Sequence, residues 1–86
     1  METFRIYTED KNASGIERET AKLFTGATFL TGTGLYAGET EPSRIIEIVT
    51  DESEHHAVEA LAERIKKMNH QSAVLVTETP TQSEVV

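Results

Sequence analysis

The chain has 86 residues, which is enough for one domain with a modest core. It contains no cysteine, so a disulfide framework, a thiolate metal site and a thiol nucleophile are excluded. Fifteen acidic residues against eight basic ones give a net charge of −7, and we therefore expect no non-specific binding to nucleic acid. With neither a signal-peptide pattern nor an apolar run near the roughly 18 residues of a membrane span, we expect no membrane partner and a cytoplasmic location, the host cytoplasm if the chain is viral.

The hydrophobic pattern predicts six elements. Two capping-box patterns support the two helices in this prediction. Ser14 is followed three residues later by Glu17, and Asp51 by Glu54. We expect the elements, in chain order, to be a strand over Thr3–Thr8, a helix over Ser14–Phe24, a strand over Ala27–Ala37, a strand over Arg44–Thr50, a helix over Asp51–Asn69 and a strand over Ser72–Glu78.

This order, βαββαβ, predicts an α+β fold, specifically a ferredoxin-like two-layer sandwich with a four-stranded antiparallel sheet. Residues 1–80 should form that single domain. Residues 81–86 follow Pro80 and are polar, so we expect a flexible C-terminal tail. The segment between the second and third strands, residues 38–43, is expected to be a loop.

The period of two divides each strand between two faces. One face should lie beneath the helices, and its side chains are Phe4, Ile6, Ile46, Ile48, Val74 and Val76. The other face should carry Arg5, Tyr7, Ile45, Glu47, Val49 and Leu75, with no helix over it. Covering its four large apolar side chains would be worth roughly 6–12 kcal/mol, at about 1.5–3 kcal/mol each. We therefore predict that these six residues form the interface of a homo-oligomer. The alternatives are that a ligand or a foreign protein covers this face, or that one strand has a different register and the six residues do not share a face.

One segment is dense in glycine, Gly32-Thr33-Gly34-Leu35-Tyr36-Ala37-Gly38. It precedes a strand rather than a helix, so it is neither a dinucleotide-binding loop nor a P-loop. One interpretation is a bulged strand with a glycine turn. The other is a ligand site, in which bare backbone admits the ligand and Tyr36 offers a flat ring. The expected ligand-binding set, suited to a small anionic ligand, is Gly32, Gly34, Tyr36, Arg44 and Gln71.

The histidines give a weaker signal. His55 or His56 with Glu59 supplies only two ligands on one helix face, whereas zinc needs three or four, and His70 lies at the far end of that helix. We expect no metal and no cofactor. No nucleophile elbow, triad or spaced carboxylate pair is recognisable, so no catalytic residue is assigned.

Three segments resemble small uncharacterised ferredoxin-like proteins of bacteria and phages: Gly32-x-Gly34-x-Tyr36-x-Gly38, Arg44-Ile45-Ile46-Glu47-Ile48 and His70-Gln71-Ser72-Ala73-Val74-Leu75-Val76. The resemblance covers about residues 25–78. Two positions depart from the pattern, since His70 replaces an asparagine and Ser72 an acidic residue. The resemblance implies the fold and a viral or prophage origin, and it supplies no activity.

These observations favour a non-enzymatic, oligomeric binding module, phage-encoded, that sequesters a small nucleotide-like signal or inhibits a host protein. The alternative is a small enzyme acting on an anionic or nucleotide-like substrate. In that enzyme Tyr36, His55, His56 or His70 would transfer protons.

Overall fold

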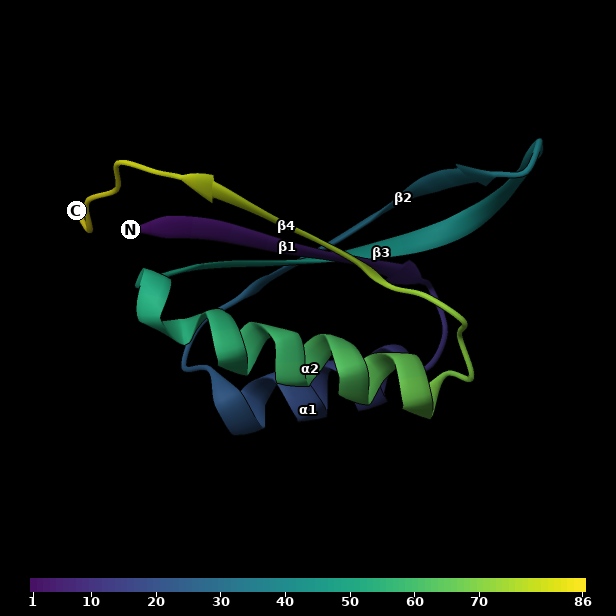
Figure 1. Cartoon of the computed structure of the whole chain (residues 1–86), viewed down its shortest axis with the longest axis horizontal. Helices are drawn as coiled ribbons and strands as arrows, with labels where there is room; N and C mark the ends of the chain where they lie inside the picture. Colours follow the sequence, from purple (N-terminus) through teal and green to yellow (C-terminus); the bar gives the residue numbers. More distant parts are fainter.

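All 86 residues are described by a computed structural model. The elements are β1 (Glu2–Glu9), α1 (Ala13–Leu23), β2 (Thr28–Tyr36), β3 (Glu39–Thr50), the single 3₁₀ turn η1 (Glu52–Glu54), α2 (His55–Met68) and β4 (Leu75–Pro80). Both helices lie on one side of the sheet and leave its other face uncovered (Figure 1). We call this uncovered side of the sheet the open face.

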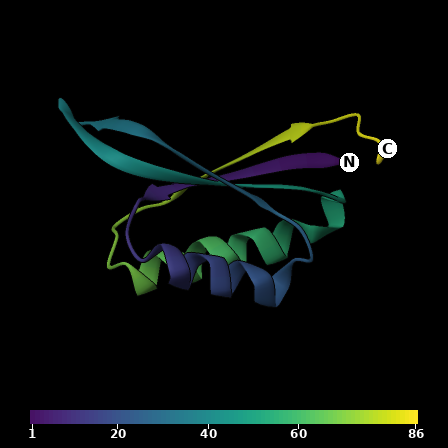
Figure 2. The same cartoon turned by 180° about the vertical axis from the view of Figure 1, so that it is seen from behind.

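The strands form one antiparallel sheet in the order β2-β3-β1-β4. This arrangement confirms the predicted ferredoxin-like sandwich. The two edge strands are β2 and β4, and the β2–β3 hairpin extends well past the ends of the helices (Figure 2). Just after β4, the Thr81 amide donates to the Met1 carbonyl at 3.0 Å. Mobility of residues 81–86 stays a prediction.

The core lies between the sheet and the helices. Phe4 and Ile6 from β1 and Ile46 and Ile48 from β3 are buried, as their alternation predicts. The helices contribute the remaining members, which are Ile16 from α1 and Val58, Leu61, Ala62 and Ile65 from α2. Val74 and Val76 are half-buried against this cluster. Neither helix is long and apolar enough to cross a membrane.

The first helix begins earlier than the sequence predicts. Its N-cap is Asn12, whose side-chain oxygen accepts from the Gly15 amide at 3.2 Å, so Ser14 does not cap it. Asn12 adopts φ 56°, a left-handed conformation that asparagine tolerates better than most residues. At the other end Leu23 is 45% exposed and lies outside the core.

The second helix is capped as expected at Asp51, whose carboxylate accepts from the Ser53 amide at 2.8 Å. One 3₁₀ turn precedes the regular helix, which ends at Met68. The two helices are joined through Glu19, which is largely buried and lies 3.1 Å from the Lys22 ammonium and 3.3 Å from the Arg64 guanidinium. The last strand is displaced from the prediction, because residues 72–74 approach the sheet before pairing begins at Leu75.

The prediction of a loop over residues 38–43 is wrong. Only Ala37 and Gly38 form the turn, with φ 51° and 81°, and β3 starts at Glu39. Positive φ at both central residues is typical of a type I′ hairpin turn, whose twist matches that of the strands. Pro42 lies within β3, yet pairing with β2 is continuous from Thr28 to Tyr36 and shows no bulge at the glycines.

Candidate functional site

A row of apolar side chains crosses the open face. Tyr7 on β1 is the register partner of both Ile45 on β3 and Leu75 on β4, and Ile45 is in turn the partner of Leu30 on β2. Register partners present their side chains on the same face. Leu30 is 44% and Leu75 61% exposed, so the row Leu30–Ile45–Tyr7–Leu75 meets solvent.

The predicted interface residues therefore share one face, but they are not one continuous apolar surface. In the next row the Arg5 Nε donates to Glu47 Oε2 at 2.9 Å. This ion pair separates Val49, which is opposite Thr3, from the apolar row. The sequence reasoning also missed Leu30. Leu30 alternates in phase with Gly32, Gly34 and Tyr36, but the glycines carry no side chain to show which face that phase belongs to.

The part of β2 that leads into the hairpin turn, residues 32–36, extends the open face beyond the apolar row. We call this part the hairpin root. Gly32, Gly34 and Tyr36 continue the alternation from Leu30, so they lie on the same face and form a strip of bare backbone ending in an exposed ring. A Cβ built at Gly34 would meet Ser43 at 3.5 Å, an ordinary contact. The fold therefore tolerates a methyl group there, and the lack of one leaves room for a ligand.

Two carboxyl groups lie beside this strip. Glu41 is the register partner of Gly34, and its side chain hydrogen-bonds with that of Glu9. Burial, together with the hydrogen bond and charge of Glu9, raises the pKa of Glu41 above its ordinary value. The Lys11 ammonium, 3.0 Å from the Glu9 carboxylate, holds the pKa of Glu9 below its ordinary value. Glu41 therefore gives up its proton less readily than Glu9 does.

The other two predicted ligand contacts lie on the opposite side of the sheet. Arg44 is the register partner of Thr8, which is buried beneath the helices, and its Nε donates to Asp10 at 2.9 Å. Gln71 hydrogen-bonds with Thr8 through its side-chain oxygen. The sheet thus separates Arg44 and Gln71 from the glycine strip. Arg44, the cation expected to bind an anionic ligand, is therefore not on the strip, and the charged groups beside the strip are Glu9, Glu41 and the Lys11 ammonium that pairs with Glu9.

The three histidines do not form one site: the His55 and His56 ring centroids lie 5.9 Å apart, and His70 does not join them. His55 bridges two carboxylates, with Nε2 2.6 Å from Glu59 and Nδ1 3.1 Å from Glu78 on β4. His70 lies beyond the other end of α2, about 20 Å away at 1.5 Å per residue. No group of three or more His, Asp and Glu side chains has an arrangement that could hold a metal ion.

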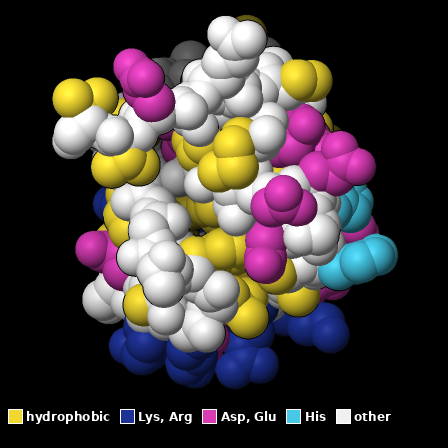
Figure 3. All heavy atoms as spheres, turned by 90° about the vertical axis from the view of Figure 1, so that its left-hand side faces the viewer, with side chains coloured by type: hydrophobic (Ala, Val, Ile, Leu, Met, Phe, Trp, Pro, Cys, Tyr) yellow, Lys and Arg dark blue, Asp and Glu magenta, His cyan; other side chains and the backbone are white.

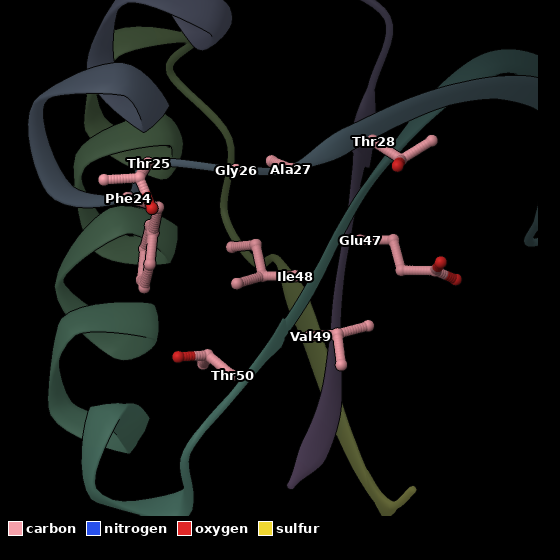
Figure 4. A pocket seen from close by; sticks show the side chains of 9 residues that line it. All are labelled: Phe24, Thr25, Gly26, Ala27, Thr28, Glu47, Ile48, Val49 and Thr50. Carbon is pink, nitrogen blue, oxygen red and sulfur yellow. The ribbon is translucent and has the colours of Figure 1, made fainter. Parts of the chain in front are cut away.

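Two hollows lie outside the hairpin root. The first, about 280 Å³, lies between the connection from α1 to β2 and the end of β3. In Figure 3 it is a pit among apolar side chains, with the basic side chains gathered below it on the helical side. In Figure 4 Phe24 and Ile48 lie on its helical side, while Glu47 and Val49 point the other way. The second, about 490 Å³, is a groove between α2 and β4.

Together, the fold and the open face define a small ferredoxin-like protein. No family model and no curated protein sequence matches the chain. Solved structures do match it in fold. A phage SAM lyase in its apo state has a TM-score of 0.72 and 20% identity, over 91% of this chain and 78% of the lyase. A DUF3240 family protein from Shewanella baltica has a TM-score of 0.76 and 9% identity, over 99% and 93%.

A functionally unknown protein from Pediococcus pentosaceus has a TM-score of 0.66 and 21% identity, over 99% of this chain and 96% of that protein. These likenesses are consistent with the predicted resemblance to small bacterial and phage proteins. At such identities they establish the fold.

Proposed function

We propose that the chain is the subunit of a small homo-oligomer that binds a nucleotide-like, positively charged ligand at the hairpin root. The observation that carries the proposal is the continuity of the open face. A water-exposed apolar row leads directly into a strip of bare backbone flanked by Glu9 and Glu41. A second copy covering the row would enclose the strip.

The charge of the site decides the ligand class. An anionic ligand would meet carboxylates at the strip and would find Arg44 on the other side of the sheet, already paired with Asp10. A cation would be attracted by the chain's net charge of −7 and could compete with Lys11 for the Glu9 carboxylate. Tyr36, 79% exposed, offers a flat ring on which a nucleobase or a cation can stack.

S-adenosylmethionine is the ligand to test first. It combines a nucleoside with a permanent sulfonium charge, and one protein of similar fold is named a SAM lyase. Sequestering such a metabolite would be consistent with a phage-encoded module that acts on its host. The protein would then lower the free concentration of the ligand without changing it chemically.

A second candidate function is cleavage of the same ligand. The likeness to a lyase favours it. Breaking a carbon–sulfur bond of a sulfonium releases a neutral thioether, so the substrate carries its own leaving group. A protein nucleophile is not required if the ligand's own carboxylate oxygen attacks that carbon, because the new carbon–oxygen bond replaces the carbon–sulfur bond and closes a lactone, with no proton transferred.

Native mass spectrometry with and without S-adenosylmethionine tests the proposal. We expect an oligomer that gains the ligand mass, and Gly34→Ala should weaken binding about tenfold or more by filling the strip. Gly26→Ala is the matched control, since a Cβ at Gly26 meets nothing within 4 Å. A monomer that binds no ligand would overturn the proposal. Chromatography of the incubated ligand separates the candidates, because a binder returns it intact and a lyase converts it faster than buffer does.

A further inference from the structure

The outer edge of β2 has no protection of the kind that edge strands usually carry. The strand is at the border of the sheet, and seven of its nine residues are exposed. Residues 25–38 contain no charged side chain, although 27% of the chain is charged. Natural proteins guard exposed edges with lysine, proline, bulges or covering segments. Here the pairing is regular from Thr28 to Tyr36, and no bulge interrupts it.

The hairpin geometry identifies the backbone groups that face outward. The residues flanking a two-residue turn, Tyr36 and Glu39, form a hydrogen-bonded pair, and the pairs then alternate. Residues 28, 30, 32, 34 and 36 therefore direct their amides towards β3. Phe29, Thr31, Thr33 and Leu35 direct theirs away from the sheet. Pro42 fits this pattern. It is the register partner of Thr33, and this pair forms no hydrogen bonds across the hairpin, so the amide hydrogen that proline lacks is not needed there.

A second copy of the chain suits this edge better than other surfaces do. Copies that each carry −7 repel one another, so contact is least costly where neither copy places a charge. The edge is also continuous with the apolar row, because Leu30 belongs to both. We propose that the outer edge of β2 pairs, strand to strand, with the outer edge of β2 in a second copy. The proposal rests on the self-association proposed above and adds to it a second contact, at the edge of the sheet, distinct from the contact over the open face.

Amide hydrogen exchange followed by NMR tests this pairing. In the assembled protein the amides of Thr31 and Thr33 should exchange as slowly as those of Gly32 and Gly34, which bond to β3. When the protein is diluted below its dissociation constant, amide exchange at Thr31 and Thr33 should accelerate at least tenfold more than amide exchange at Gly32 and Gly34. If the protein is an oligomer and the Thr31 and Thr33 amides still exchange freely, the edge pairing is wrong and self-association stands.

Two substitutions give an independent measurement. Thr33→Pro removes an outward amide without removing a bond to β3, so the monomer should fold and the dissociation constant should rise about tenfold or more. Thr33→Val retains the amide and is the matched control. Thr31→Lys adds a charge at the edge and should act in the same direction, which guards against a proline-induced misfold. Unchanged association in both Thr33→Pro and Thr31→Lys would overturn the proposal.

Discussion

Arg5 and Glu47 are register partners at the centre of the open face, and the Arg5 guanidinium donates to the Glu47 carboxylate at 2.9 Å. Both groups are solvent-accessible, so the pair adds little to the stability of one subunit. Its position matters more. It places one positive and one negative charge beside the apolar row, where a symmetric copy would present the same two charges in return.

The ion pair therefore predicts a specificity for self-association. Glu47→Lys puts two cations side by side and should raise the dissociation constant of the oligomer, while thermal unfolding of the subunit changes little. The charge-swapped double variant, Arg5→Glu with Glu47→Lys, restores opposite charges and should restore assembly. Sedimentation equilibrium of the three proteins checks this. Equal association in all three would show that the interface lies away from these residues.

The sequence predicted the layers of this protein well, because strong period-two and helical patterns determine which face is buried. Phe4 and Ile48 lie in the core for that reason. It predicted the open face only in part, since Leu30 lies in a strand whose glycines obscure the phase. The carboxyl pair was missed because Glu9 and Glu41 come from distant segments. Only the register, with β3 extended through Pro42, brings them together.

The N-cap of the first helix gives a prediction about stability. Asn12 accepts a hydrogen bond from the Gly15 amide while holding φ 56°. Asn12→Ala loses the bond and retains an unfavourable conformation, so the free energy of unfolding should fall by about 0.5–2 kcal/mol. Asn12→Gly loses the same bond but relieves the conformation, and only a few tenths of a kcal/mol should be lost. Urea denaturation of the two variants measures the difference, and a larger loss in the glycine variant would contradict the argument.

The hairpin turn offers a stabilising substitution. Ala37 has φ 51°, a conformation that costs an ordinary residue roughly 1–2 kcal/mol. Asparagine and glycine adopt it with less strain, so Ala37→Asn should raise the free energy of unfolding by on the order of 1 kcal/mol. Ala37→Val, which is β-branched, should lower it and provides the opposite control. Thermal unfolding of both variants tests the turn assignment, and a stabilising valine would contradict it.

The carboxyl pair predicts how stability depends on pH. The folded-state pKa of Glu41 is raised, so this residue stabilises the fold below its unfolded-state pKa and loses that contribution as pH rises through the folded-state value. For Glu9, whose folded-state pKa is lowered, the contribution is present above the unfolded-state pKa and is lost as pH falls through the folded-state value.

Glu41→Gln keeps the shape of the neutral carboxyl and cannot ionise, so it should raise the melting temperature at pH 7 and flatten the melting profile on the acidic side of neutrality. Glu9→Gln removes the ion pair with Lys11, and it should lower the melting temperature at pH 7. Glu63→Gln, on the distant helix α2, is the control for loss of a negative charge. The measurement is a series of thermal unfolding curves between pH 3 and pH 8. A Glu41→Gln profile parallel to that of the unmodified protein would show that Glu41 ionises without hindrance and that the two carboxyls do not share a proton.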